Sequence, residues 1–331
     1  MAQVFLHIGQ YKTGTTAVQD TLYSNRAALA QQGYIYPGAL LRGTAHFRLS
    51  DNFFNSPRAV EERLAQNLPP ALSSDSDAFV FSNEGLSGYS TLLSKHDELG
   101  KLWRLLAHHF QGCDLTVVTY VRPQVAAIES RIIQSIKGFS KQHEIDMGEL
   151  LAPSSPVNYL DFAERLQAAF PAAKLLFRVF DRSTLVGGDV VDDFCAATGI
   201  DASALDRPKT EPNVSPSGAF VRYKMLSQTP SFAQVFAQFG VSAQRMDQLA
   251  YMYCEAEGQP KAVVFDSEVR TTIQQTFAAT NAAFARQFLS SEDAETFLDR
   301  TARPVGEVTP NLELSAPQLL DILARAQREG T

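Results

Sequence analysis

The chain has 331 residues, of which 45% are hydrophobic and 20% charged, and its formal net charge is -7. This composition is typical of a globular protein, and the acidic balance argues against general binding of nucleic acid. The three cysteines are far apart and form no CxxC pair, so we expect reduced thiols. No spacing typical of metal ligands occurs, and no apolar run is long enough for a signal peptide or a transmembrane segment. We therefore expect a cytoplasmic protein without a metal centre.

An apolar run opens the chain and leads into a glycine-bounded loop. Four of the five residues at 4–8 are apolar, and Gly9, four further residues and Gly14 follow them. Periodic apolar residues come next, so the pattern predicts a strand over 3–8 and a helix over 14–31. A strand, a glycine-bounded turn and a helix start place several backbone N–H groups around one point, and such an arrangement binds anions.

Three further pairs of strand and helix signals follow. We predict strands over 78–81, 115–121 and 174–180, and helices over 58–68, 95–110, 123–138, 158–170 and 189–198. This alternation predicts an α/β fold with a central, mostly parallel sheet flanked by helices on both faces. Ligands bind such sheets at the carboxyl ends of the strands. The stretches 9–16, 82–85 and 122–130 all follow strand ends, so we expect them to converge.

The pattern of the sequence changes after about residue 200. Closely spaced prolines mark a connection there, namely Pro208, Pro212 and Pro216. Beyond them only helical periods recur, over 217–228, 243–257, 266–289, 291–300 and 316–328. We therefore expect an α/β core at 1–200 and an all-helical C-terminal cap at 201–331 that packs on the same domain.

The first loop departs from the Walker A pattern of nucleotide hydrolases. That pattern requires Gly-x4-Gly-Lys-Ser/Thr, whereas Thr15 stands directly after Gly14 and the lysine is Lys12, inside the loop. A lysine at that place would lie over the terminal group of an anion bound at the helix start. The predicted strand over 78–81 is followed by Ser82-Asn83-Glu84, and the one over 115–121 is followed by Arg122, so neither leads into a Walker B aspartate. Magnesium-dependent nucleotide chemistry is therefore disfavoured.

Two motifs together resemble the signatures of sulfotransferases that use 3′-phosphoadenosine-5′-phosphosulfate (PAPS). The run Gly9-Gln-Tyr-Lys-Thr-Gly-Thr-Thr16 resembles the 5′-phosphosulfate loop of that family, in which a lysine and one variable residue precede Gly-Thr-Thr. Arg122 at a strand end and Ser130, eight residues later in the next helix, resemble its 3′-phosphate site. A weaker similarity to the bacterial carbohydrate-type branch extends along 25–37, 81–85 and 193–199. The resemblance implies a P-loop NTPase-like three-layer fold, PAPS as the donor, a hydroxyl or amine acceptor and no metal.

The resemblance also implies roles for individual residues. The donor would be held by the loop and the 3′-phosphate pair, that is, by Gln10, Tyr11, Lys12, Thr13, Gly14, Thr15, Thr16, Arg122 and Ser130. Lys12 would stabilise the oxygen that leaves sulfur, together with the backbone N–H groups of residues 13–16. Arg122 would bind the 3′-phosphate through charge-assisted hydrogen bonds, with Ser130 as a second donor.

Sulfuryl transfer also needs a base for the proton of the acceptor, and two residues are candidates. Glu84 ends the second predicted strand, where related sulfotransferases place active-site residues. His46 lies in the preceding loop, and an imidazole has an ordinary pKa that suits a base. Glucosamine sulfotransferases carry a catalytic glutamate near the place of His46, and this chain lacks it. The similarity to the carbohydrate-type branch implies a small-molecule, oligosaccharide or glycolipid acceptor.

Two other functions are compatible with the same residues. A kinase with a degenerate P-loop would bind ATP together with Mg²⁺. A non-catalytic nucleotide-binding scaffold would bind a nucleotide without transferring any group, and the missing family glutamate near His46 suggests it. A sulfotransferase would instead bind a 3′,5′-bisphosphate without a metal.

Overall fold

A computed structural model of the chain describes residues 1–10, 12–72, 77–87, 96–138, 147–207, 215–237, 242–256 and 260–329. The chain forms two compact units that interleave along the sequence. The first unit comprises residues 1–124, 147–210 and 276–303, and the second comprises 125–146, 211–275 and 304–331. Residues 276–303, which belong to the predicted C-terminal cap, therefore lie in the same unit as the predicted strands.

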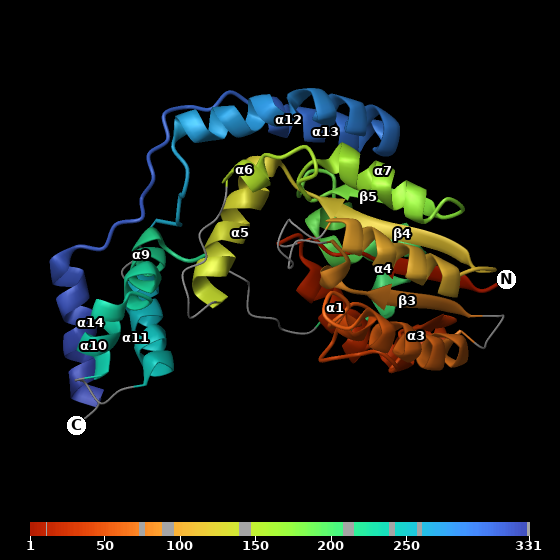
Figure 1. Cartoon of the computed structure of the whole chain (residues 1–331), viewed down its shortest axis with the longest axis horizontal. Coiled ribbons are helices and arrows are strands. Elements are labelled where there is room, and N and C mark those ends of the chain that lie inside the picture. The colour runs from red at the N-terminus through yellow and green to blue at the C-terminus, as the bar shows by residue number, and fades with distance from the viewer. Residues whose placement is uncertain are drawn as a thin grey trace. The chain divides into compact units, whose positions relative to one another are not determined.

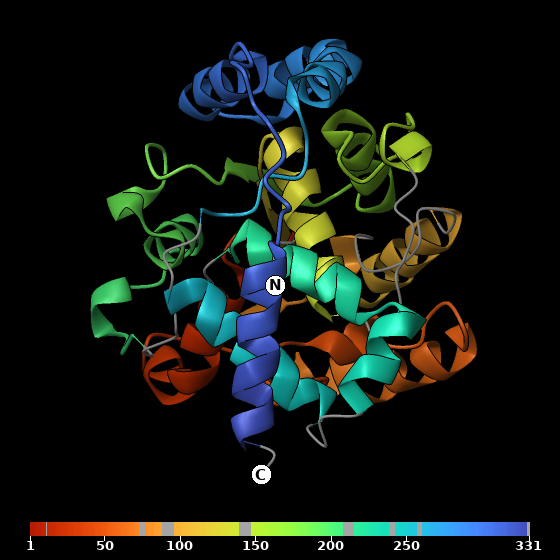
Figure 2. The ribbon, with the colours of Figure 1, turned by 90° about the vertical axis from the view of Figure 1, so that its left-hand side faces the viewer.

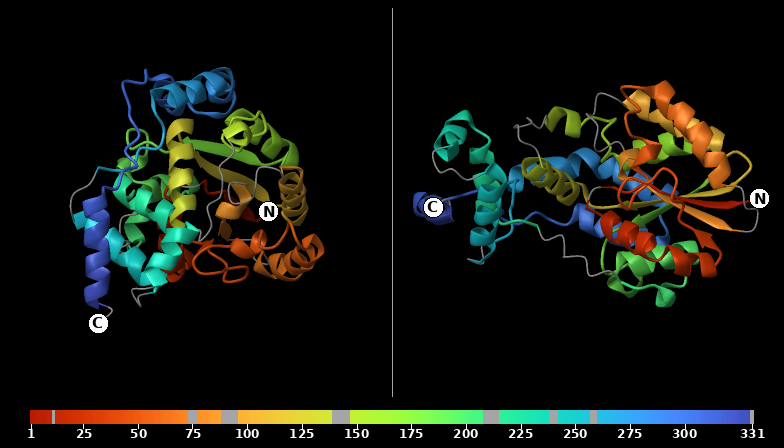
Figure 3. Two further views of the ribbon diagram at one scale, coloured as in Figure 1. Left: turned by 60° about the vertical axis from the view of Figure 1, so that its left-hand side comes forward. Right: turned by 90° about the horizontal axis from the view of Figure 1, so that it is seen from below.

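The first unit is built on a sheet of five parallel strands in the order β2-β3-β1-β4-β5. In chain order the strands are β1 Gln3–His7, β2 Tyr34–Ile35, β3 Ala78–Ser82, β4 Asp114–Val121 and β5 Lys174–Val179. Helices cover both faces of this sheet (Figure 3, right). The predicted α/β fold with a central parallel sheet is thereby confirmed. Among the strands that the structure describes, only the short edge strand β2 lies outside the predicted ones.

Two apolar clusters form the core of the first unit, one on each face of the sheet, because alternate strand residues point to opposite faces. Leu6 of β1 packs in one cluster with Trp103, and its neighbour Phe5 packs in the other with Val18. Helices of the first face are α3 Pro57–Ala71, α4 His96–His109 and α7 Tyr159–Ala169. Helices of the second face are α1 Thr15–Ser24, α2 Arg26–Gln31 and α8 Val190–Thr198.

Two late helices, α12 (Ser267–Phe288) and α13 (Ser291–Ala302), complete the first of these faces. Phe284 and Phe297 from these helices are both fully buried. The ring centroid of Phe284 lies 5.2 Å from that of Phe177, and the centroid of Phe297 lies 5.7 Å from that of Phe284. The end of α12 and all of α13 therefore belong to the core beside β5 and α7 (Figure 1).

The helix predicted over 14–31 is in fact two helices, because the chain breaks at Asn25 between α1 and α2. The side-chain amide of Asn25 donates to the carbonyl oxygens of Thr21 and Asp206, each at 2.8 Å. The backbone of Asn25 departs from helical angles, with a φ of -103° and a ψ of 21°, although its N–H still donates to the carbonyl oxygen of Thr21 at 3.1 Å. Shorter elements connect the main ones, namely 3-10 helices at Phe47–Leu49, Glu84–Ser87, Val186–Gly188 and Ala202–Ala204, and α6 at Met147–Leu150.

The second unit is helical, as predicted for much of the C-terminal region. Its helices are α5 Gln124–Gly138, α9 Gly218–Ser227, α10 Pro230–Ala237, α11 Ala243–Ala256 and α14 Ala316–Glu329. Helix α14 lies against α11, where Ile322 packs into a cluster with Phe220 and Met246 (Figure 2). Within the described part of the chain, no helix has both the length and the apolar character needed to cross a membrane.

Candidate functional site at the loop after the first strand

Two glycines shape the loop between β1 and α1, at the carboxyl end of the central strand. Gly14 has a φ of 76°, and a Cβ there would lie 2.6 Å from Cγ1 of Val190. A Cβ on Gly9 would lie 2.4 Å from the side chain of Thr15, so the backbone passes directly against that residue. Gly14 is the N-cap of α1, and no described side chain caps the helix. The N–H groups of its first turn therefore have no partner within the helix and can bind an anion.

Polar side chains fill the inside of the loop. Gln10 and Thr13 are only 2% and 1% exposed. The hydroxyls of Thr13 and Thr15 donate to the carbonyl oxygen of Gln10, at 2.8 and 3.3 Å. The side-chain amide nitrogen of Gln10 has no hydrogen-bond partner among the described residues. A buried donor without an acceptor costs roughly 1–3 kcal/mol, so this amide is available to an acceptor on a ligand.

Glu84 reaches the loop from the end of the neighbouring strand, since β3 pairs with β1 as far as Ser82. The residue is partly buried and begins the short helix that follows β3. Burial raises the pKa of the Glu84 carboxyl, and a hydrogen bond with Thr15 and the charge of Lys12 oppose that effect. The structure thus brings Lys12 of the loop and Thr15 of α1 close to the carboxylate of Glu84, which follows β3.

His46 is fully buried, and both of its ring nitrogens are bonded to the main chain. Nδ1 accepts a hydrogen bond from the N–H of Ser82 at 3.1 Å, so Nε2 carries the proton and donates to the carbonyl oxygen of Pro37 at 2.9 Å. Burial lowers the pKa of His46 to about 4. His46 therefore supports the end of β3 and offers no nitrogen to an acceptor, which leaves Glu84 as the candidate base.

The remaining predicted site residues lie in several environments. Arg122 follows β4 and is half-buried, and its carbonyl oxygen accepts a hydrogen bond from the hydroxyl of Tyr159 at 2.5 Å. Thr16 is exposed at the second position of α1. Ser130 is half-buried on α5 and belongs to the second unit. Tyr11 lies outside the described residues.

Hydrogen bonds among three buried polar side chains connect β1, β3 and α1. The hydroxyl of Ser82 lies 2.9 Å from Nδ1 of His7 and 3.1 Å from Nε2 of Gln19. Burial lowers the pKa of His7 to about 3, so its ring is neutral. These residues were not among the predicted site residues. Polar residues at buried positions of a predicted strand and helix are the signal that could have indicated them.

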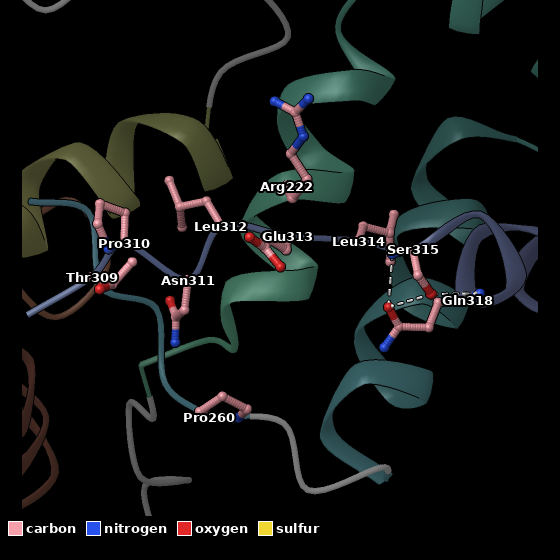
Figure 4. A pocket seen from close by; sticks show the side chains of 10 residues that line it. All are labelled: Arg222, Pro260, Thr309, Pro310, Asn311, Leu312, Glu313, Leu314, Ser315 and Gln318. Atoms are coloured by element: carbon pink, nitrogen blue, oxygen red, sulfur yellow. Dashed lines mark hydrogen bonds between the residues drawn. The ribbon is translucent and has the colours of Figure 1, made fainter.

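Two hollows lie away from this loop. In the second unit, a hollow of about 680 Å³ has Arg222 of α9 on one side and Asn311 and Glu313 of the segment before α14 on the other (Figure 4). In the first unit, a groove of about 490 Å³ is lined by Tyr23 and Arg26, among others. Neither hollow is lined by a residue of the loop. Among the described residues, no group of three or more His, Cys, Asp and Glu side chains is placed to hold a metal ion.

Comparisons with known proteins add little to this geometry. The chain matches no protein-family model, and no solved structure matches it. It is similar to an uncharacterized protein of Archaeoglobus fulgidus, with 31% identity over 103 residues, which are 30% of this chain and 26% of that protein. The chain thus aligns with about a quarter of that relative's length.

Proposed function

We propose that the protein is a cytoplasmic sulfotransferase that moves the sulfuryl group of PAPS to a hydroxyl or amine of a carbohydrate-type acceptor. The observation that carries this proposal is the meeting of Lys12, Thr15 and Glu84 at the start of α1. Sulfuryl transfer requires three groups: an anion-binding site, a cation and a base. Here these are the start of α1, Lys12 and the partly buried carboxylate of Glu84. A small molecule, an oligosaccharide or a glycolipid precursor would serve as the acceptor.

In the proposed reaction, an oxygen of the acceptor attacks the sulfur of PAPS from the side opposite the 5′-phosphate. A bond forms between that oxygen and sulfur while the bond from sulfur to the bridging oxygen breaks, and its electron pair stays on the 5′-phosphate. Glu84 takes the proton of the acceptor hydroxyl. Lys12 and the first N–H groups of α1 stabilise the charge that develops on the leaving oxygen.

Arg122 would distinguish this donor from nucleotides without a 3′-phosphate. It directly follows β4, which pairs with β1 in parallel, so its backbone lies at the same edge of the sheet as the loop. A guanidinium group binds phosphate through charge-assisted hydrogen bonds that are often bidentate. The contribution of Ser130 to the same phosphate stays a prediction from the sequence motif.

Ligand-induced stabilisation tests the proposed donor. Adenosine 3′,5′-bisphosphate at 100 times its Kd should stabilise the protein by about 2.7 kcal/mol, and EDTA should not change this. Lys12→Ala and Arg122→Ala should each weaken binding. Lys101→Ala is the matched control because Lys101 is 57% exposed on α4. Stabilisation by ATP and Mg²⁺ without any effect of the bisphosphate would favour the kinase with a degenerate P-loop.

Transfer of radioactive sulfate from PAPS to a panel of sugars and amino sugars tests the chemistry. Glu84→Gln should lower kcat by about 10²- to 10⁴-fold, the usual contribution of a positioned base. The bisphosphate should still bind to this variant. A variant with an unchanged rate would remove Glu84 from the role of base. Binding of the bisphosphate without transfer to any acceptor would instead favour a nucleotide-binding scaffold.

A further inference from the structure

The turn that carries Glu84 is held on both sides. Before it, the side-chain amide of Asn83 donates to the carbonyl oxygen of His46 at 2.9 Å and to the hydroxyl of Ser50 at 3.0 Å. After it, the N–H of Gly85 donates to Oδ1 of Asn83 at 2.7 Å. A Cβ on Gly85 would lie 2.4 Å from Oγ of Ser50, so the backbone is also packed closely there. The backbone on both sides of Glu84 is therefore held in place at the end of β3.

An anion in the loop would meet a negative charge as well as positive groups. Lys12 from the loop and Thr15 from α1 face the carboxylate of Glu84. The hydroxyl of Thr15 also lies 3.3 Å from the carbonyl oxygen of Gln10, and its single proton can go to one of these two acceptors at a time. The positive charge of Lys12 is therefore shared between the negative charge of the carboxylate and that of any bound anion. Each additional negative charge on the ligand meets repulsion from Glu84.

The terminal groups of a phosphosulfate and a diphosphate are similar in shape and differ in charge. A terminal sulfuryl group carries one negative charge, whereas a terminal phosphoryl group carries about 1.5 to 2 at pH 7. We propose that Glu84 makes the loop selective for a singly charged terminal group, so that it accepts PAPS and rejects the phosphate isostere 3′-phosphoadenosine 5′-diphosphate. This inference rests on the proposed function, and it gives Glu84 a role in donor specificity besides that of base.

The expected selectivity follows from the strength of charge repulsion in a partly buried site. With an effective dielectric constant of about 20, an extra negative charge several ångströms from a carboxylate weakens binding by roughly 10- to 100-fold. A glutamine in place of Glu84 has nearly the same shape, and its carbonyl oxygen can still accept the hydrogen bond of Thr15. The substitution therefore removes the charge and keeps the contact.

Competition against labelled adenosine 3′,5′-bisphosphate measures the selectivity. The affinities for PAPS and for 3′-phosphoadenosine 5′-diphosphate are compared at pH 7.5 in the wild type, Glu84→Gln and Glu84→Asp. The wild type should prefer PAPS by roughly 10- to 100-fold, and Glu84→Asp should keep most of this preference. Glu84→Gln should bind the two ligands within about threefold of each other. Glu62→Gln is the control because Glu62 is 60% exposed on α3.

Each outcome separates this inference from the proposed function. A wild type that binds both ligands equally, or a Glu84→Gln variant that keeps the preference, overturns the selectivity and leaves the sulfotransferase proposal standing. A wild type that binds neither ligand overturns both. Glu84→Ala repeats the neutral substitution with a smaller side chain, and it decides the question if circular dichroism shows that Glu84→Gln is unfolded.

Discussion

Gly14 lies where the chain turns from the loop into α1, in a backbone conformation that other residues rarely adopt. Its φ is 76°, and a Cβ there would lie 2.6 Å from Cγ1 of Val190. Gly14→Ala should therefore lower the free energy of unfolding by about 3 kcal/mol, since it combines backbone strain with a steric clash. Gly43 is the matched control, because its φ is 66° and no described atom lies within 4 Å of the Cβ position. Gly43→Ala should lower the free energy of unfolding by about 1 kcal/mol. If urea unfolding shows the same loss for both variants, the clash with Val190 is contradicted.

Two buried histidines should make the protein sensitive to acid. Burial lowers the pKa of His46 to about 4 and that of His7 to about 3, against 6.5 for an ordinary imidazole. Between these values the unfolded chain binds more protons than the folded one. The free energy of unfolding is therefore highest above about pH 6.5 and falls as the pH decreases, by up to about 1.4 kcal/mol per pH unit for each histidine.

Urea unfolding at a series of pH values checks this dependence. His46→Gln should reduce the slope between pH 6.5 and 4, since one of the two groups that take up protons on unfolding is removed. His108→Gln should leave the slope unchanged, because His108 is exposed on α4. An unchanged slope in His46→Gln would mean that His46 is not kept neutral by burial.

At the scale of single residues, the sequence predicts the loop better than its surroundings. The positions of Lys12, Gly14 and Thr15 follow from a short local pattern, because the loop and the start of α1 are continuous in the chain. A side chain that lies 30 to 70 residues along the chain from the loop is brought near it by strand pairing. Whether that side chain is exposed or hydrogen-bonded there depends on the same pairing. For that reason His46 could be named as a base from its residue type, although its two nitrogens are bonded to the main chain.

At the scale of elements, α13 is held to the sheet by a buried charge network around Asp293. Oδ1 of Asp293 accepts from the N–H of Val179 and Oδ2 accepts from Arg178, both at 3.1 Å. Asp293 is 1% exposed, and Arg178 also pairs with the fully buried side chain of Asp193. Because one partner of a buried pair is costly to remove, Asp293→Asn should lower the free energy of unfolding by about 3 kcal/mol.

The matched control for this network lies on the same helix. Asp299 pairs with Arg303 at 2.7 Å, and these side chains are 60% and 57% exposed. Asp299→Asn should change the free energy of unfolding by no more than about 1 kcal/mol, because solvent screens exposed pairs. Thermal and urea unfolding of both variants give the comparison. Similar small effects would show that Asp293 does not anchor α13.

The main strands and helices could be predicted because each carries its own apolar period. The strand predicted over 115–121 corresponds to β4, and the helix predicted over 266–289 corresponds to α12. The two-residue strand β2 is too short to show a period. The break at Asn25 coincides with a side-chain hydrogen bond to Asp206, and no local pattern can indicate a partner so far along the chain. Packing of α12 and α13 on the sheet likewise depends on contacts between distant segments.

At the scale of the whole molecule, the discontinuous first unit sets where the chain can be shortened. Its core includes Phe284 and Phe297, which come after more than sixty residues of the second unit. Loss of a buried phenylalanine costs about 3–5 kcal/mol, and the whole stability of a domain is about 5–15 kcal/mol. A chain of residues 1–200 should therefore not fold by itself, although the sequence suggests an α/β core with that boundary.

Two truncated chains separate this effect from loss of the C-terminal helix. A chain ending at residue 303 and a chain ending at residue 275 both lack α14, and they differ only by residues 276–303 of the first unit. Trp103 is the single tryptophan and is 1% exposed in the first unit, so its fluorescence reports folding of the sheet and its helices.

The longer chain should keep the emission of a buried tryptophan and a cooperative urea transition. The shorter chain should show an exposed tryptophan without such a transition, because the apolar face covered by the end of α12 and by α13 is left open to water. Equal transitions in both chains would show that this face needs no cover from these helices.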